Sequence, residues 1–106
     1  MRESQFQANL IKELKVEFPG CVVLKNDPNY LQGFPDLMLL FNDHWAALEC
    51  KRQEDASHQP NQDHYIKKLN SMSFATFIHP GNKKEVLDEL HKSFGFDRST
   101  CISRSK

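Results

Sequence analysis

The first stretch of the chain carries apolar residues at helical spacing. They lie three and four positions apart, which predicts a helix over about residues 3–17. The stripe consists of Phe6, Leu10, Ile11 and Leu14. Pro19 and Gly20 follow and are expected to end the helix.

Later apolar runs predict four short strands and two further helices. Runs of apolar and branched residues favour strands over residues 21–24, 37–41, 45–51 and 73–78. Helical spacing returns over residues 60–71 and 83–94, where Pro60 suits a helix start and Gly95 a helix end. The predicted order is α-β-β-β-α-β-α, an α/β chain (α+β with a mixed sheet).

Size and composition fit one globular domain over residues 1–106, with residues 97–106 expected to form a flexible tail. No apolar stretch approaches the roughly 20 residues that cross a bilayer, and the N-terminus lacks a signal-peptide core. The three cysteines include no C-x-x-C pair, so neither a disulfide framework nor a zinc ribbon is indicated. A cytoplasmic location is expected.

The chain has 14 basic and 14 acidic residues, so its formal net charge is zero. This balance is not typical of a protein that coats nucleic acid by bulk charge. It leaves room for local basic clusters. The candidates are Lys51-Arg52, Lys67-Lys68, Lys83-Lys84 and the set Arg98, Arg104 and Lys106.

Two short acidic motifs stand at hairpin spacing. Pro35-Asp36 is followed after twelve residues by Glu49-Cys50-Lys51. If Asn42-Asp43 form a two-residue turn, cross-strand counting sets Asp36 opposite Glu49. Lys51 lies two positions beyond Glu49 and shares its face of the sheet, whereas a three-residue turn would shift this register by one.

A face with two carboxylates and one ammonium suits a divalent cation held against a phosphate. Mg²⁺ and Mn²⁺ prefer oxygen ligands, and the side chains of Asp36 and Glu49 supply them. The Cys50 side chain is expected to point into the core, while its backbone carbonyl can still reach a metal. Lys51 can orient a water or stabilise the phosphate. The competing interpretation is an ordinary hairpin with solvated charges.

The pair Pro35-Asp36 and Glu49-Cys50-Lys51 resembles the PD-(D/E)XK nuclease motif, and the element order resembles that superfamily's restriction-endonuclease-like αβββαβ core with an added C-terminal helix. The pattern Gly33 to Leu37, Leu48 to Lys51 and a downstream glutamine is similar to the VRR-NUC branch, which includes small phage and bacterial proteins related to Holliday junction resolvases. The resemblance implies a Mg²⁺- or Mn²⁺-dependent phosphodiester hydrolase without an organic cofactor. It also implies Asp36 and Glu49 as metal ligands, Lys51 as the catalytic lysine, and the host cytoplasm as location if the protein is phage-encoded.

Two helix-borne residues are candidates for the rim of this site. Glu3 continues the apolar stripe of the first helix, and the resemblance makes it an outer or water-mediated metal ligand; the alternative is a solvated acid at a helix start. Gln62 leads the stripe of the second helix, and the resemblance supports contact with a water or phosphate; the alternative is a boundary glutamine. Tyr65 is too close to Gln62 for the tyrosine role of some relatives.

The histidines do not show the paired spacing of a zinc site, and each is expected at the surface. They are His44, His58, His64, His79 and His91. The loop before Asp36 carries Asp27, Asn29, Tyr30 and Gln32 at the expected mouth of the site. No single residue of that loop stands out.

The leading hypothesis is a DNA endonuclease that selects branched, flapped or junction DNA by shape and acts as a homodimer, because two copies supply two sites for two strands. The second hypothesis is a non-catalytic nucleic-acid-binding or partner-binding module that keeps the nuclease fold. The third is a zinc-binding regulatory domain. Metal binding and cleavage assays discriminate among them.

Overall fold

The computed structural model describes residues 2–95 of the chain, and these form three helices and four strands. The elements are α1 (Glu3–Glu17), β1 (Val22–Lys25), β2 (Leu37–Phe41), β3 (His44–Cys50), α2 (Pro60–Met72), β4 (Phe74–Ile78) and α3 (Lys83–Ser93). The predicted order of elements is confirmed, with shifts of one residue at some ends. The tail predicted over residues 97–106 lies outside the described residues.

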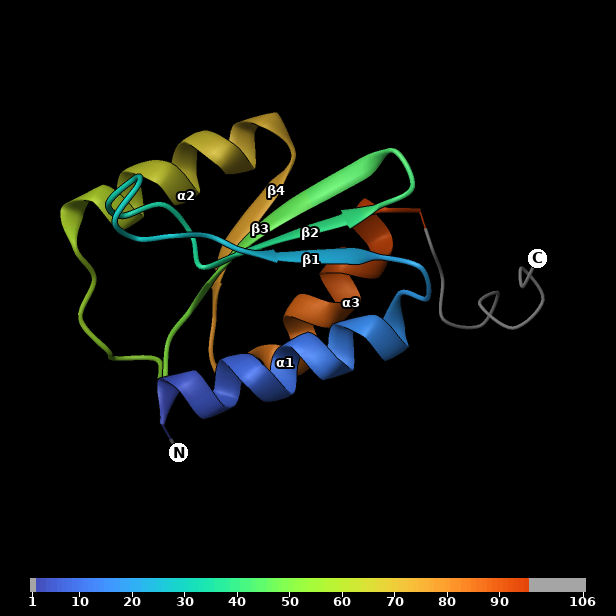
Figure 1. Ribbon diagram of the computed structural model, residues 1–106, viewed down its shortest axis with the longest axis horizontal. Coiled ribbons are helices and arrows are strands. Elements are labelled where there is room, and N and C mark those ends of the chain that lie inside the picture. Colours follow the sequence, from blue (N-terminus) through green and yellow to red (C-terminus); the bar gives the residue numbers. More distant parts are fainter. Residues whose placement is uncertain (1, 96–106) are drawn as a thin grey trace.

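The strands form one mixed sheet in the order β1-β2-β3-β4 (Figure 1). β1 and β2 pair antiparallel, as do β2 and β3, whereas β3 and β4 pair parallel. A parallel pair needs a long crossover, and α2 supplies it. The structure is therefore a mixed α/β fold, as the sequence predicts.

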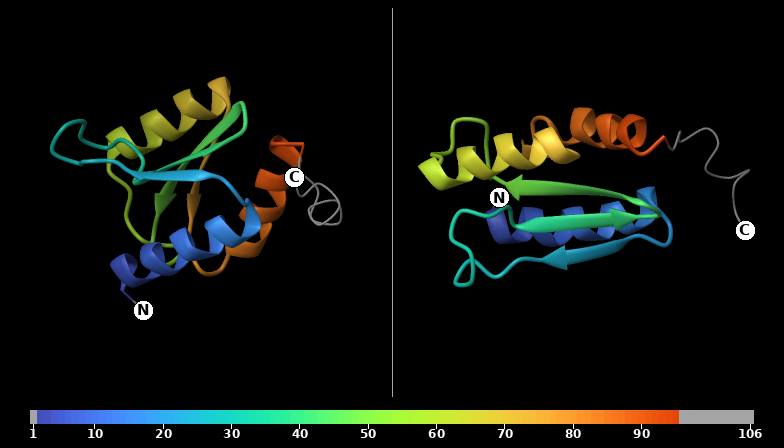
Figure 2. Two further views of the ribbon diagram at one scale, coloured as in Figure 1. Left: turned by 45° about the vertical axis from the view of Figure 1, so that its right-hand side comes forward. Right: turned by 90° about the horizontal axis from the view of Figure 1, so that it is seen from above.

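One face of the sheet is covered by α1 and α3, and it holds the main core (Figures 1 and 2). Leu10 and Leu14 of α1 pack there with Leu39 and Leu48 of the sheet, and all four are at most 1% exposed. Alternate strand residues point to this face because side chains alternate along a strand. The core thus fixes which residues of β2 and β3 point the opposite way.

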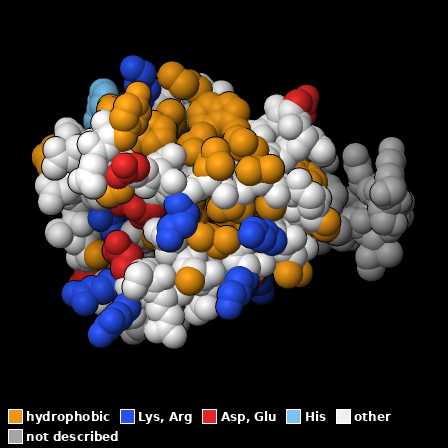
Figure 3. Space-filling model, viewed as in Figure 1, with side chains coloured by type: hydrophobic (Ala, Val, Ile, Leu, Met, Phe, Trp, Pro, Cys, Tyr) orange, Lys and Arg blue, Asp and Glu red, His pale blue; other side chains and the backbone are white. Residues whose placement is uncertain are grey.

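The second face is covered by α2, which packs over β3 and β4. Ala47, Leu69 and Ala75 form a small buried cluster there, with Trp45 and Tyr65 against it. Figure 3 shows hydrophobic side chains gathered over the sheet beside α2. The exposed large hydrophobic side chains on β1 and β2 are those of Val22, Leu24 and Leu40.

A two-residue turn joins β2 to β3. Phe41 pairs with His44, so Asn42 and Asp43 are the turn, as the sequence predicts. Asn42 has a φ of +56°, and no other non-glycine residue in the described part of the chain has a positive φ. Asparagine tolerates this left-handed conformation better than most residues, which explains its place here.

His91 is buried, so the expectation of a surface position for this histidine is wrong. Its Nε2 lies 2.8 Å from Glu17 Oε1, and its ring stacks on Phe18 at a centroid distance of 4.5 Å. The contact joins α3 to the end of α1. Within residues 2–95, no helix combines the length and apolar character that crossing a membrane requires.

Candidate functional site

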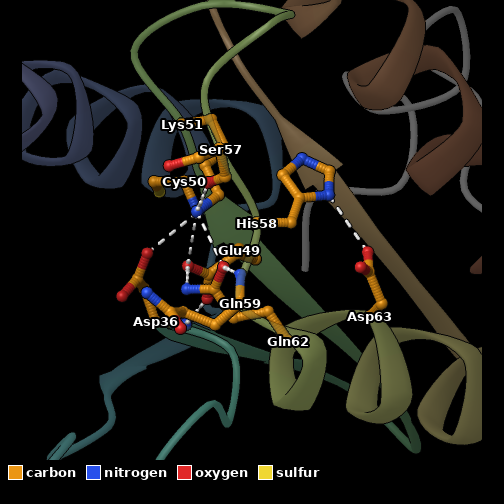
Figure 4. A network of polar contacts seen from close by, with 9 residues as sticks. All are labelled: Asp36, Glu49, Cys50, Lys51, Ser57, His58, Gln59, Gln62 and Asp63. Carbon is orange, nitrogen blue, oxygen red and sulfur yellow. Dashed lines mark hydrogen bonds and ion pairs between the residues drawn. The ribbon is translucent and has the colours of Figure 1, made fainter.

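The hairpin places Asp36 beside Glu49. Leu37 pairs with Leu48, so the next position outward sets Asp36 opposite Glu49, as the two-residue turn predicts. Two hydrogen bonds fix the pair (Figure 4). The backbone N–H of Asp36 donates to Glu49 Oε1 at 3.2 Å, and the backbone N–H of Cys50 donates to Asp36 Oδ2 at 2.9 Å.

The backbone around Asp36 is held from a second side by Asn26. The side-chain amide of Asn26 donates to the carbonyl of Pro35 at 2.7 Å, and its backbone N–H donates to the carbonyl of Asp36 at 2.8 Å. Pro35 and Leu37 are both buried. Asp36 is therefore a half-buried polar residue between two buried apolar neighbours, on backbone with its hydrogen bonds satisfied.

Side-chain alternation puts Asp36, Glu49 and Lys51 on the face that α2 covers, together with Met38 and Ala47. The sequence predicted Lys51 as the last residue of a strand over residues 45–51, but β3 ends at Cys50 and Lys51 follows it directly. Its backbone N–H still donates to the carbonyl of Ile78 at 2.8 Å, which continues the pairing with β4. The three charged groups thus share one face.

Gln62 of α2 joins the charged groups of Glu49, in β3, and Lys51, which follows β3 directly. Its Nε2 donates to Glu49 Oε2 at 2.8 Å, and its Oε1 accepts from Lys51 Nζ at 2.8 Å (Figure 4). Its Oε1 also accepts the backbone N–H of Gln59 at 3.0 Å, so the same side chain completes the start of α2. Gln62 is therefore a residue of the site and not merely a boundary glutamine.

The ammonium of Lys51 is buried among oxygen acceptors. Besides Gln62, it donates to the backbone carbonyl of Ser57 at 3.1 Å and lies 3.8 Å from Glu49 Oε2. The Lys51 residue is only 7% exposed. Ser57 was not expected at the site, and the sequence carries no sign of it because its backbone carbonyl makes the contact.

Burial and mutual repulsion make the two carboxylates costly to ionise. Burial of Glu49, and next to it the charge of Asp36, raise the pKa of Glu49 to about 8, although Lys51 opposes the shift. Burial also raises the pKa of Asp36, against the Cys50 N–H, Lys51 and Lys25. Near neutral pH such a pair binds a proton or another cation.

Cys50 points to the opposite face, as the sequence predicts, and is completely buried. Burial first, and then the charges of Asp36 and Glu49, raise the pKa of the Cys50 thiol to about 12; a hydrogen bond with the Gln7 side chain opposes this. A thiol that stays protonated is a poor metal ligand. Cys50 could thus offer a metal ion only its backbone carbonyl. Gln7 is a neighbour of this thiol that the sequence did not single out.

Glu3 is exposed at the start of α1, the helix that covers the other face of the sheet. Its charge contributes to the raised pKa of Glu49, as the last of five causes. Within residues 2–95, no three or more His, Cys, Asp and Glu side chains gather closely enough to hold a metal ion. Glu3 therefore does not form a three-carboxylate cluster with Asp36 and Glu49.

The groups present fit a hard divalent ion better than zinc. Two carboxylates and one backbone carbonyl are oxygen donors, and Mg²⁺ is commonly held by one or two carboxylates with waters and phosphate oxygens. A structural zinc site takes four ligands, mostly cysteine and histidine. The nearby His58 instead stacks on Phe77 at 4.0 Å and lies 3.0 Å from Asp63 Oδ1 through its Nδ1.

Comparisons of the chain with protein-family models, with curated proteins and with solved structures found no match.

Proposed function

We propose that this protein is a metal-dependent nuclease of the PD-(D/E)XK type that hydrolyses phosphodiester bonds in DNA. The observation that carries the proposal is the pairing of Asp36 with Glu49 on one face, with the Lys51 ammonium 3.8 Å from Glu49. Paired strands with an α2 crossover and flanking helices support a nuclease core of the αβββαβ kind.

In this proposal the carboxylates of Asp36 and Glu49, with the carbonyl of Cys50, hold Mg²⁺ or Mn²⁺. A bound ion supplies charge neutralisation for the phosphate and makes its water ligands more acidic. The burial of Glu49 beside Asp36 supports the assignment, because two neighbouring carboxylates with one ammonium leave negative charge without a sufficient counter-charge.

Lys51 stabilises charge that develops on the phosphate, since an ammonium in a site of low solvent content acts strongly on nearby charge. Gln62 and the carbonyl of Ser57 keep that ammonium in place. Gln62 also donates to Glu49, so it keeps the metal-binding carboxylate in register with the lysine. Gln62 is thus a positioning residue in this proposal.

The substrate we propose is branched, flapped or junction DNA. A chain of 106 residues leaves little surface for reading bases along a groove, so shape is the more economical basis of selection. A homodimer would present two sites to two strands. Glu3, at the start of α1, would act through water if it assists the metal.

A cleavage panel tests the proposal. Linear, flapped and four-way-junction DNA are incubated with Mg²⁺ or Mn²⁺ and with wild type, Asp36→Asn, Lys51→Ala or the control Lys12→Ala. Lys12 is an exposed lysine of α1. We expect cleavage by wild type and Lys12→Ala, with a loss of at least about 100-fold in the two site variants, in the range of single electrostatic groups in catalysis.

Equal cleavage by wild type and Lys51→Ala would refute the role of Lys51. Circular dichroism of each variant separates loss of activity from loss of fold. Metal-independent DNA binding without any cleavage, unchanged in Asp36→Asn, would instead favour the non-catalytic binding module.

A further inference from the structure

The connection between β1 and β2 carries the most exposed large hydrophobic side chain of the described residues. Tyr30 is 87% exposed, and the next residue, Leu31, is 37% exposed. Both views in Figure 2 show this connection projecting from the body of the protein. Neither residue belongs to the two apolar clusters of residues 2–95. An aromatic side chain so exposed contributes little to the core.

Hydrogen bonds shape the backbone that presents Tyr30. The Asp27 carboxylate accepts the N–H of Asn29 at 2.9 Å, and the Asp27 carbonyl accepts the N–H of Tyr30 at 3.1 Å. Phe34 then donates its N–H to the carbonyl of Leu31 at 3.2 Å. Tyr30 and Leu31 therefore lie on a turn whose backbone conformation is fixed by hydrogen bonds within the loop.

The loop is also fastened to α2, the helix that carries Gln62. Gly33 has a φ of +86°, and a Cβ at this position would lie 2.3 Å from the Cβ of Asn61. Phe34 packs edge-to-face on Tyr65 at a centroid distance of 5.3 Å. Only glycine at position 33 allows the backbone of the loop to come so close to Asn61. The loop thus has one anchor on α2 and another, through Asn26, on the backbone of Asp36.

The charge balance limits how this protein can hold nucleic acid. Phosphate contacts by lysine and arginine supply most of the affinity in proteins that bind DNA by charge, but here the formal net charge is zero. Besides Lys51, Lys25 stands near the site in the sheet, because it ends β1 and pairs with Leu37, the residue next to Asp36. A stacked base is an uncharged source of affinity, and it requires a base that is not already inside a duplex.

We propose that Tyr30 stacks on an unpaired base of DNA held at the site of Asp36 and Glu49, with Leu31 against the same base or its neighbour. The inference rests on the proposed nuclease function and names its substrate class. The protein acts on DNA that offers unpaired bases next to the cleaved bond, such as a flap or an open branch point, and not on continuous duplex.

Binding by fluorescence anisotropy in Ca²⁺ compares a continuous duplex with the same duplex carrying a single-stranded flap. The proteins are wild type, Tyr30→Ala, Tyr30→Phe and Val16→Ala, the last a control because Val16 is 76% exposed on α1. We expect Tyr30→Ala to bind the flap about 5-fold to about 150-fold more weakly, the range of one base stack. Tyr30→Phe keeps the ring and should match wild type, as should Val16→Ala.

A 2-aminopurine in the flap gives a second readout. Its fluorescence should fall when wild type or Tyr30→Phe binds, and should change much less with Tyr30→Ala. The inference is overturned if Tyr30→Ala binds the flap as tightly as wild type does. It is also overturned if Tyr30→Ala loses the same affinity for the flap and for the continuous duplex.

The two proposals fail separately. If wild type binds the flap through Tyr30 but cleaves nothing in Mg²⁺ or Mn²⁺, the nuclease proposal fails and the base contact stands. If wild type cleaves the flap and Tyr30→Ala cleaves and binds it equally well, the base contact fails and the nuclease proposal stands.

Discussion

Gln62 donates a hydrogen bond from Nε2 to Glu49 Oε2 at 2.8 Å, across the space between α2 and the sheet. Since the oxygen of the same amide accepts from Lys51 Nζ, an uncharged side chain holds the Glu49 carboxylate and the Lys51 ammonium at fixed positions. The amide suits this place because it offers a donor to the carboxylate and an acceptor to the ammonium.

Replacing Gln62 by alanine should destabilise the protein and reduce cleavage. Glu49 would lose a donor and Lys51 an acceptor, and an unsatisfied buried polar group costs about 1–3 kcal/mol. Urea unfolding measures the free-energy change, and the cleavage assay measures the second effect. Gln5→Ala, on the exposed part of α1, is the matched control and should change neither. Wild-type stability of Gln62→Ala would contradict a structural role for the bridge.

The stability of the metal-free protein should fall as pH rises. The pKa of Glu49 is raised from its ordinary value of 4.5 to about 8, so the native state holds this proton more tightly than the unfolded chain. The contribution of this proton to the stability of the native state is complete below about pH 4.5. It declines between pH 4.5 and about pH 8, and it is lost above about pH 8. The steepest slope from one such group is about 1.4 kcal/mol per pH unit.

Urea unfolding across this pH range, with EDTA present, compares wild type with Glu49→Gln. The glutamine variant lacks the titrating group, so its stability should depend less on pH. Parallel pH profiles for the two proteins would show that Glu49 does not titrate in this window.

Divalent ions should stabilise the wild type, because an ion that binds only the native state shifts the unfolding equilibrium. We expect the melting temperature to rise with Mn²⁺ concentration, and more at pH 8 than at pH 6, since protons compete for Glu49. Asp36→Asn and Glu49→Gln should remove most of this response. Asp55→Asn, an exposed control, should keep it. An equal response in all four proteins would place the ion elsewhere.

The sequence predicted the hairpin, and it placed Asp36 opposite Glu49 on the condition of a two-residue turn at Asn42-Asp43. The structure has that turn, and strand alternation then determines the register. Gln62 could be predicted because it leads a helical stripe. The Ser57 contact could not, since every residue has a backbone carbonyl and only the path of the chain brings this one to Lys51.

The burial of His91 was missed for a different reason. Its partner Glu17 is 74 positions away along the chain, and neither residue marks the other in the sequence. The position of Glu3 also depends on tertiary structure, because the stripe shows which side of α1 packs on the sheet but not how far its first residue reaches toward the other face. Long-range packing determines both.

Asn42 lies in the two-residue turn between β2 and β3, which sets the register of Asp36 and Glu49. Asn42→Gly should preserve stability and cleavage, because glycine adopts a positive φ without steric strain. Asn42→Val should cost about 1–2 kcal/mol in the free energy of unfolding, since a branched side chain is strained in the left-handed region. Urea unfolding of both variants measures the difference, and equal stability would contradict the left-handed turn.

One residue inserted between Asn42 and Asp43 should have a larger effect on activity than on stability. A longer loop can close at small entropic cost, yet a register shift of one would move Asp36 away from Glu49. The Mn²⁺-dependent rise in melting temperature should then disappear, and DNA cleavage with it. An equal insertion after Glu54, in the exposed segment before Ser57, is the control for an added residue. If the protein with the turn insertion keeps both the Mn²⁺-dependent rise in melting temperature and DNA cleavage, the site does not depend on the hairpin register.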